Sequence, residues 1–572
     1  MESGAAAATW SCVISSHFFP HLSSSERRTP VVTTWSAPAA MTWLARRILA
    51  GTRRPIARAF SATSSSVSSP SADAAEPVDV CIVGGGIVGT ALACSIRANP
   101  LTAHLTVSLA DRAPPPASAW LDDPPPTPEP RVSALTPASV ALLRDVGAWD
   151  RVEASRRACA FRAMQVWDAE AVGHVRYDAS EVGATELGHV VENRVVHTAL
   201  HEAARRLGVQ TSPPAAAVAL DLPADGGGDL ATIKFRREGR DDDEDGDGDE
   251  DGTPEIEEVR ARLVVGADGP SSKVRTLAGL RAAGWRYGLK AAVGTVATDK
   301  PHGTAWQRFL PTGPLALLPV TEDGRVSNVV WTTTPEEADR LCGLCDEAFA
   351  AEVDAALRGE GRHSHGGQGE VGTGEGKRRR PGFVYGFEGQ WLMGEAQERL
   401  VDVLLKPATE AAIRAVANGF GGTAGDDAAP PFEHPPRVVA AAGPRGAFPL
   451  ATSLAGRYAL RRLALVGDAA HQVHPLGGQG VNLGMRDVVL LTDALAAACA
   501  NGGDVGSMLV LRGYANAANG ANVPMMAALD GLQRLFASDQ PLVAWARGAG
   551  LAGVNALGPI RRRIARYAMG GA

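Results

Sequence analysis

One glycine-rich segment constrains the fold of this 572-residue chain more than any other feature. The apolar stretch Val78–Val83 leads into a G-x-G-x-x-G motif, and the helical stretch Thr90–Arg97 follows it. Gly84 allows a tight turn after the strand, Gly86 lets the backbone approach a pyrophosphate, and Gly89 lets helix and strand pack closely. This order of strand, turn and helix predicts the first unit of a dinucleotide-binding α/β domain.

A carboxylate stands where such a domain needs one. We expect a second strand over Leu105–Leu109, and Asp111 follows it about 20 residues past the last glycine of the motif. A carboxylate at this place accepts hydrogen bonds from a ribose 2′-hydroxyl and would repel a 2′-phosphate. The motif therefore predicts FAD or NAD as the ligand and does not separate the two.

Two later strand-like segments also end in a turn with an aspartate. The first runs into Asp268 and Gly269, and the second runs into Gly467 and Asp468. A carboxylate in such a turn can bind a ribose or ribityl hydroxyl, although each turn alone is also compatible with an ordinary aspartate turn. The three turns in this order favour FAD.

A glycine-rich loop follows the third turn and opens a helix that we expect over Val481–Ala500. The N–H groups at the start of a helix can face a flavin ring and favour negative charge on it. His471 and His474 are three residues apart, but no further candidate ligand accompanies them, so we expect a structural role and no metal site. The residues expected to border the ring are Pro475, Gly477, Gly478, Gln479 and Gly480.

These motifs resemble those of the class A flavoprotein monooxygenases, and within them the hydroxylases of ubiquinone biosynthesis. The resemblance extends from about Val78 to Arg566 and is interrupted by insertions. The segments that carry it are Arg131–Ser139, Glu192–Arg194, Gly284–Gly288, Trp306–Pro314, Phe448–Leu450 and Gly467–Gly480.

The resemblance implies an α/β fold. A Rossmann-like FAD-binding domain would hold an inserted β-sheet substrate domain, as in 4-hydroxybenzoate hydroxylase, and a C-terminal helical segment would follow. It places Arg131 and Arg194 facing the cofactor. It also places Gly84, Gly86, Gly89 and Asp111 at the ADP half of FAD, and Asp268, Gly269, Gly467 and Asp468 along the ribose, pyrophosphate and ribityl chain. No side chain is expected to act as a catalytic nucleophile.

The resemblance further implies a reaction. The enzyme would insert one oxygen atom from O2 into a polyprenylated 4-hydroxybenzoate, at ring carbon 5, through a hydroperoxide formed on the flavin. Ferredoxin and its reductase, or NADPH directly, would supply the electrons, and other subunits of the coenzyme Q biosynthetic complex would be partners. The alternatives are a class A monooxygenase acting on another aromatic substrate and a flavin-dependent isoprenoid reductase.

Strand-like runs over Lys290–Ala297, Thr304–Leu310, Leu315–Pro319 and Ser327–Thr333 predict the sheet of the substrate domain. Trp306 and Arg308 lie two residues apart on one strand and therefore share a face. This face either points at the flavin and substrate or packs within the sheet domain, and the sequence leaves both open.

The expected domain limits follow from these motifs and from changes in composition. The acidic stretch 236–258 and the glycine- and proline-rich stretches 358–381 and 419–436 are expected to be disordered insertions. We expect a transit peptide over 1–60, a linker over 61–77, the FAD-binding domain over 78–283 and 441–505, the substrate domain over 284–440 and a helical region over 506–572.

The first 60 residues have the composition of a mitochondrial transit peptide. They carry seven arginines against Glu2 and Glu26 and are rich in serine and alanine. We expect cleavage near Ser61, and translation could begin at Met1 or Met41. Residues 551–568 are basic with apolar residues at helical spacing, which suits either an anionic membrane surface or a solvated helix. With the resemblance, this predicts a peripheral enzyme on the matrix side of the mitochondrial inner membrane.

Composition excludes several other classes. The net charge is −7, but it arises from the acidic insertion, so the bulk of the fold is near neutral and offers no general field for nucleic acid. Seven cysteines in a chain of this length do not make a disulfide framework. Cys342 and Cys345 lie in a stretch that we expect to form one helix, Glu336–Phe349, and no second pair accompanies them to make a zinc site.

Overall fold

The computed structural model describes residues 76–171, 173–223, 230–237, 256–360, 429–538 and 540–570. The predicted transit peptide lies outside the described residues. So do most of the predicted linker and most of the three predicted insertions.

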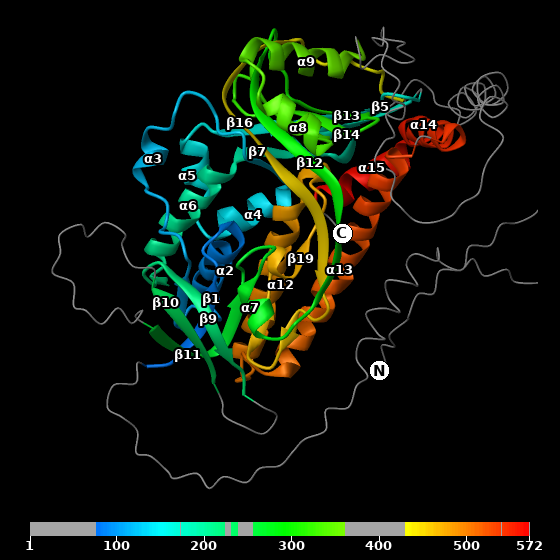
Figure 1. Ribbon diagram of the computed structural model, residues 1–572. Coiled ribbons are helices and arrows are strands. Elements are labelled where there is room, and N and C mark those ends of the chain that lie inside the picture. The colour runs from blue at the N-terminus through cyan, green and yellow to red at the C-terminus, as the bar shows by residue number, and fades with distance from the viewer. Residues whose placement is uncertain are drawn as a thin grey trace, which may run out of the picture. The chain divides into compact units, whose positions relative to one another are not determined.

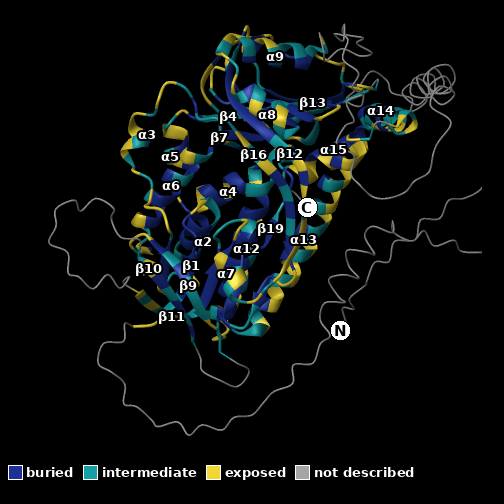
Figure 2. Ribbon diagram, in the orientation of Figure 1, coloured by how far each residue is buried: buried dark blue, intermediate teal, exposed yellow. Residues whose placement is uncertain are grey.

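Parallel pairing of buried strands builds the first sheet (Figure 1). Its order is β17-β18-β11-β1-β2-β8; β10 pairs antiparallel with β11, and β9 pairs antiparallel with β10. Val80, Cys81 and Ile82 of β1 are fully buried, as expected for a parallel sheet covered on both faces (Figure 2). The strands are β1 Val78–Val83, β2 Val107–Ala110, β8 Gln210–Thr211, β9 Ala215–Asp221, β10 Ala231–Arg237, β11 Ile256–Gly266, β17 Ala459–Leu460 and β18 Leu463–Leu465.

Helices and a small sheet surround this first sheet. The antiparallel order β3-β7-β4 forms the small sheet, from Val132–Leu135, Gly188–Glu192 and Ala158–Phe161. Helix α2 packs against α6 and α12. The helices of this part are α2 Ile87–Ala98, α3 Ala119–Asp122, α4 Pro137–Asp145, α5 Trp149–Ala154, α6 Asn193–Arg206, α7 Lys273–Leu277 and α12 Gln479–Ala500.

The second large sheet has the order β19-β16-β12-β15-β14-β13-β5-β6 and is antiparallel except for the β13–β5 pair. Two long strands of this sheet, β12 Ala282–Thr298 and β16 Val438–Ala455, pair with each other over most of their length (Figure 1). Strands β5 and β6 come from the chain before residue 284, so this sheet draws on more of the sequence than the expected substrate segment. The other strands are β5 Ala163–Asp168, β6 His174–Asp178, β13 Thr304–Leu310, β14 Gly313–Pro319, β15 Val326–Thr333 and β19 His471–Gln472.

Two helices cover one face of the second sheet. The sequence predicted a single helix over Glu336–Phe349, but the structure has α8 Pro335–Cys342 and α9 Asp346–Arg358. Thr334 caps the start of α8, Gly343 is its C-cap, and the extended backbone of Cys345 separates it from α9. Cys345 therefore lies in a turn between two helices.

Helices α13 Met508–Phe536, α14 Pro541–Ala556 and α15 Gly558–Ala568 form the C-terminal region. Buried ion pairs fix it to the second sheet and its neighbours. Arg547 pairs with Asp168 at the end of β5, and Arg561 bonds Glu181 with 2.7 Å between Nε and Oε2. In the described part of the chain, no helix is long and apolar enough to cross a membrane.

Candidate functional site

The three turns predicted from the sequence meet at the carboxyl ends of neighbouring parallel strands. The Gly84 N–H donates to the Ala110 carbonyl at 2.8 Å and the Ala267 N–H to the Val83 carbonyl at 2.7 Å. The Val466 N–H donates to the Gly266 carbonyl at 3.0 Å. In open α/β sheets, this edge is where ligands bind.

The glycines of the first turn behave as their motif requires. Gly84 has a φ of +112°, and a Cβ there would lie 2.4 Å from the Ala267 carbonyl carbon. A Cβ on Gly89 would lie 1.9 Å from the Gly84 oxygen, whereas one on Gly86 would meet nothing within 4 Å. The backbone therefore leaves no room for a side chain at Gly84 and Gly89, whereas there is room for a ligand beside Gly86.

Asp111 lies directly beside this turn, at the end of β2. Its Oδ2 accepts the Gly85 N–H at 2.5 Å, and its Oδ1 accepts the Ala113 N–H at 2.7 Å. The carboxylate is partly exposed, so it remains accessible to a ribose hydroxyl.

The second turn is more rigid than its sequence suggested. Both oxygens of Asp268 are engaged, because they accept the Ser272 hydroxyl at 2.5 Å and the Lys273 and Val274 N–H groups at 2.6 and 3.0 Å. Asp268 therefore fixes the start of α7. Gly269 follows it with a φ of +81°.

The third turn is held by a buried carboxylate that sequence reasoning missed. Asp487 of α12 accepts the Gly467 N–H at 2.9 Å and the His471 Nε2–H at 2.6 Å through Oδ2. Its Oδ1 accepts the Asn522 amide at 2.8 Å. Asp487, His471 and Asn522 are fully buried. The only signal in the sequence is an acid within an otherwise apolar helix face.

Charges around the third turn shift the ionisation of its other acid. Burial raises the pKa of Asp468, with Asp487 adding to the effect and His471 opposing it. Burial lowers the pKa of His471, but the attraction of Asp487 and its hydrogen bond prevail and raise it above the usual value. Asp468 is the one carboxylate of this turn that is partly exposed at the sheet edge.

The two histidines near this turn do not form a metal pair. His471 bonds Asp487, whereas the His474 ring lies edge-on against Tyr287 with 4.9 Å between the ring centroids. Burial lowers the pKa of His474 to about 4, so its ring is neutral at physiological pH. Among the residues that the structure describes, no three His, Cys, Asp or Glu side chains are grouped to hold a metal ion.

The glycine-rich loop lies against β3 and leaves the start of α12 uncapped. Gly477 and Gly478 have φ angles of +72° and +63°, and a Cβ on Gly478 would lie 3.1 Å from the Ala134 Cβ. The Asn482 amide donates to the carbonyls of Ala134 at 2.8 Å and Gly478 at 3.1 Å. No side chain caps the helix, so its first N–H groups can face a ligand.

Of the two arginines expected at the cofactor, Arg131 directly precedes β3 and Arg194 lies in the first turn of α6. The Asn193 N–H donates to the Arg131 carbonyl at 2.9 Å, and the Arg131 side chain is exposed. Arg194 pairs with Glu129 at 3.0 Å and lies over the Trp120 ring at 4.6 Å. Arg131 is therefore open to solvent, whereas Arg194 already has partners.

The structure decides the question about the face of β13. Trp306 and Arg308 are buried against the helices that cover the second sheet, and Arg308 donates to the Ala356 carbonyl of α9 at 2.7 Å. Packing within the sheet domain is therefore their role. The opposite face carries Phe309, which stacks on Phe536 at 3.7 Å and belongs to one apolar cluster with Leu476 of the glycine-rich loop.

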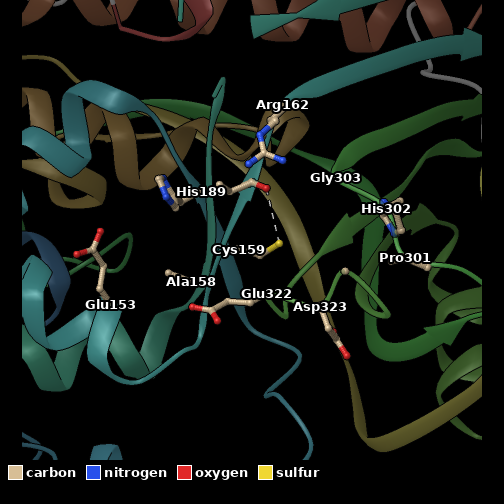
Figure 3. A pocket seen from close by; sticks show the side chains of 12 residues that line it. Glu153, Ala158, Cys159, Arg162, His189, Pro301, His302, Gly303, Glu322 and Asp323 are labelled. Atoms are coloured by element: carbon tan, nitrogen blue, oxygen red, sulfur yellow. Dashed lines mark hydrogen bonds between the residues drawn. The ribbon is translucent and has the colours of Figure 1, made fainter. Parts of the chain in front are cut away.

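A pocket of about 580 Å³ lies between β4 and the turns that follow β12 and β14 (Figure 3). Cys159, His189 and His302 line it together with the carboxylates of Glu322 and Asp323. Burial raises the pKa of the Cys159 thiol to about 11, and the two carboxylates add to the effect. No lining residue belongs to the three turns, so this pocket is separate from the candidate cofactor site.

Comparison with known proteins agrees with this geometry. The sequence matches the family described as FAD binding domain over residues 77–359 and 430–509. It is 33% identical over 500 residues to the mitochondrial ubiquinone biosynthesis monooxygenase of Xenopus tropicalis. The match covers 86% of this chain and 93% of that protein. The chain belongs to the family of FAD-dependent ubiquinone biosynthesis monooxygenases.

Other members of this monooxygenase family match over similar lengths. The human mitochondrial ubiquinone biosynthesis monooxygenase is 31% identical over 86% of this chain and 92% of its own length. The 3-demethoxyubiquinol 3-hydroxylase of Escherichia coli is 30% identical over 86% of this chain and 99% of its own. The protein is therefore an FAD-dependent monooxygenase of ubiquinone biosynthesis.

Solved structures of this monooxygenase class share the fold. The p-nitrophenol 4-monooxygenase of Pseudomonas putida has a TM-score of 0.54 at 18% identity, covering 86% of this chain and 98% of that one. The anhydrotetracycline hydroxylase of Streptomyces rimosus has a TM-score of 0.51 at 18% identity, covering 86% of this chain and 76% of that one. The residues present fit FAD, because there is open space beside Gly86 at the sheet edge and no side chain caps the start of α12.

Proposed function

We propose that the enzyme hydroxylates the aromatic ring of a polyprenylated 4-hydroxybenzoate at ring carbon 5, with O2 as the oxygen source. The observation that carries the proposal is the apolar cluster beside the glycine-rich loop. Val473 and Leu476 belong to one buried cluster with Phe309 of the second sheet and with Leu529 and Phe536 of α13. An apolar wall next to the cofactor suits a ring that bears an isoprenoid tail.

The predicted site residues are assigned to parts of FAD as follows. Gly84, Gly86, Gly89 and Asp111 hold the ADP half, and Arg131 and Arg194 face the cofactor. Asp268, Gly269, Gly467 and Asp468 line the ribose, pyrophosphate and ribityl chain. Pro475, Gly477, Gly478, Gln479 and Gly480 border the flavin ring. The positive φ angles of Gly84, Gly269, Gly467, Gly477 and Gly478 support these backbone contacts.

Bound FAD, once reduced, supplies the activation of O2. The chain supplies orientation and dryness. The buried Phe309–Phe536 stack excludes water from the space beside the loop. The uncapped N–H groups of α12 favour negative charge on the ring. No nucleophilic side chain is required.

The experiment supplies purified, FAD-loaded enzyme with prenylated 4-hydroxybenzoate under ¹⁸O2. One reaction contains NADPH and the other contains ferredoxin with its reductase. We expect a product heavier by one ¹⁸O atom and expect the ferredoxin reaction to be faster. Substrate-dependent reduction of the tail without O2 uptake would indicate an isoprenoid reductase. Equal turnover of unprenylated 4-hydroxybenzoate would indicate a soluble aromatic substrate.

We further propose that the enzyme works in the mitochondrial matrix, in the coenzyme Q biosynthetic complex, after removal of residues 1–60. The mitochondrial relatives and the arginine-rich start of the sequence support this location. Mass spectrometry of the mature protein should find an N-terminus near Ser61. An intact N-terminus on the organellar protein would contradict the proposal.

Helix α15 is proposed to contact the inner membrane. Ile560, Ile564 and Tyr567 are exposed at spacings of four and three residues, and Arg563 and Arg566 are exposed beside them. An exposed apolar row flanked by arginines suits an anionic bilayer surface.

Flotation with vesicles tests this contact on the full chain. We expect the triple variant I560S/I564S/Y567S to float less than wild type with anionic vesicles. The control is Leu509→Ser, since Leu509 is 88% exposed at the start of α13, away from α15 in the sequence. Equal flotation of the triple variant and wild type would contradict the contact.

A further inference from the structure

Three polar side chains converge on one backbone oxygen in the first turn. The Gly85 carbonyl oxygen lies 2.6 Å from His197 Nε2, 2.9 Å from His201 Nε2 and 2.9 Å from the Thr90 hydroxyl. The two Nε2 atoms are 3.1 Å apart. A carbonyl oxygen accepts about two hydrogen bonds, so the two imidazoles and the Thr90 hydroxyl share its two lone pairs.

The donors come from the helices on one side of the turn. His197 and His201 lie one turn apart on α6, which packs against α2, and Thr90 belongs to α2. Thr90 is fully buried and His201 is nearly so, whereas His197 is half-buried. Burial lowers the pKa of His201, so this ring is neutral and its Nε2 can carry the proton that the carbonyl needs.

The other side of the same residue is also fixed. The Gly85 N–H donates to Asp111 Oδ2 at 2.5 Å. Because a trans peptide holds its C=O and N–H in opposite directions, fixing the Gly85 carbonyl on the α6 side aims the Gly86 N–H away from α6. A Cβ on Gly86 would meet nothing within 4 Å, so there is room for a ligand beside this residue.

A run of three glycines offers little resistance to a peptide flip, because glycine adopts positive and negative φ with similar ease. After a flip of the Gly85–Gly86 peptide, the carbonyl would face the pyrophosphate and the N–H would be withdrawn from it. Donors that hold the carbonyl on the α6 side prevent this arrangement.

We propose that His197 and His201 are positioning residues that hold the Gly85 carbonyl, keep the Gly86 N–H directed at the FAD pyrophosphate, and so set the affinity for FAD. This proposal concerns the binding of FAD and does not depend on the identity of the aromatic substrate.

The test measures the Kd for FAD by quenching of flavin fluorescence on titration with apoprotein. A leucine at either position removes the donor, and we expect the Kd to rise about tenfold for H197L or H201L and more for the double variant, since a lost hydrogen bond to a buried partner has about this effect. A glutamine places an N–H near the position of Nε2, so H197Q and H201Q should stay within about threefold of wild type.

Thr198→Val is the matched control on the same helix. Thr198 is fully buried and its hydroxyl has no hydrogen-bond partner among the described residues, so its replacement should leave the Kd for FAD unchanged. Melting of each apoprotein separates a loss of fold from a loss of affinity. If a leucine variant does not fold, H197N and H201N take its place, because asparagine is polar but too short to reach the carbonyl. Leucine or asparagine variants that bind FAD as tightly as wild type would refute the proposal.

Discussion

The first and third turns of the FAD site are built from glycine alike but are secured in different ways. In the first turn, imidazoles from α6 hold a backbone carbonyl, and His197 is only half-buried. In the third turn, the fully buried carboxylate of Asp487 holds a backbone N–H, an imidazole and an amide. A buried charge is costly to leave without partners, whereas a partly exposed donor can be replaced by water. Loss of these supporting side chains should therefore act on cofactor affinity at the first turn and on the stability of the whole protein at the third turn.

Asp487→Ala gives the largest expected effect. It leaves the Gly467 N–H, His471 and Asn522 without their acceptor inside the core, and loss of one partner from a buried charged network costs about 3–5 kcal/mol. Urea unfolding of apoprotein and FAD-loaded protein should show the loss in both. Asp493→Ala on the exposed side of α12 is the control and should change the free energy of unfolding by less than about 0.5 kcal/mol. An Asp487 variant as stable as wild type would contradict the proposed difference between the first and third turns.

Gly89→Ala and Gly86→Ala separate stability from affinity within the first turn. An alanine Cβ at Gly89 would lie 1.9 Å from the Gly84 oxygen, so α2 must shift, and such overpacking costs about 1–3 kcal/mol. At Gly86 the Cβ enters open space, so the apoprotein should keep its stability while losing affinity for FAD. Absorbance of bound flavin and thermal unfolding check both variants. Equal loss of stability at the two positions would contradict this prediction.

Asp268→Ala tests the second turn against the first. Asp268 caps α7, and removing a helix cap costs about 1 kcal/mol. Asp111→Ala should instead weaken FAD binding, since Asp111 borders the first turn and is partly exposed. Unfolding free energy and the Kd for FAD should therefore rank the two variants in opposite orders. The same ranking in both measurements would show that Asp268 contacts the cofactor more directly than its hydrogen bonds suggest.

The smallest expected effect is a difference in pH dependence. The pKa of His471 is raised by Asp487 and Asp468 against the effect of burial, so its stabilisation is present below pH 6.5 and is lost as the pH rises through the folded pKa. The pKa of His201 is lowered by burial and by His197 and Arg205, with Gly85 and Asp111 opposing. Its stabilisation is therefore present above pH 6.5 and is lost as the pH falls.

Unfolding of the apoprotein variants H471Q and H201Q between pH 5 and pH 9 checks these signs. The deficit of H471Q relative to wild type should shrink as the pH rises, and that of H201Q should shrink as the pH falls. Deficits that move in the same direction with pH would show that one of the two histidines has been assigned the wrong ionisation.

The sequence sufficed for the three turns because their chemistry belongs to the backbone. Gly84, Gly89, Gly467, Gly477 and Gly478 all stand where a side chain would clash or where φ is positive, and such positions are visible as glycine in a motif. The sequence could not show what the side chains of Trp306 and Arg308 pack against. Alternation along a strand determines which residues share a face of the sheet, but not which element covers that face.

The side chains that hold the turns in place could not be predicted from the sequence, for a different reason. The i, i+4 spacing of His197 and His201 shows that they share a helix face, but their acceptor is a backbone carbonyl far away in the chain. In the sequence, Asp487 looks like an ordinary acidic residue of a helix. Its role is seen only in the structure, where Asn522 of α13 donates a hydrogen bond to it. The break at Gly343 was missed because the residues on both sides favour a helix.

The strand order of the first sheet also determines when the cofactor site can be completed. Strand β18 pairs directly with β11, and β11 with β1, although strands β12 to β16 of the second sheet lie between β11 and β18 in the sequence. A chain emerging from a ribosome, or threading through a translocase, exposes the first turn long before the third exists. Pairings between such distant segments form slowly. The proposed FAD site is therefore completed last, and a polypeptide truncated before Leu463 would hold the first glycine motif without the glycine-rich loop at the start of α12.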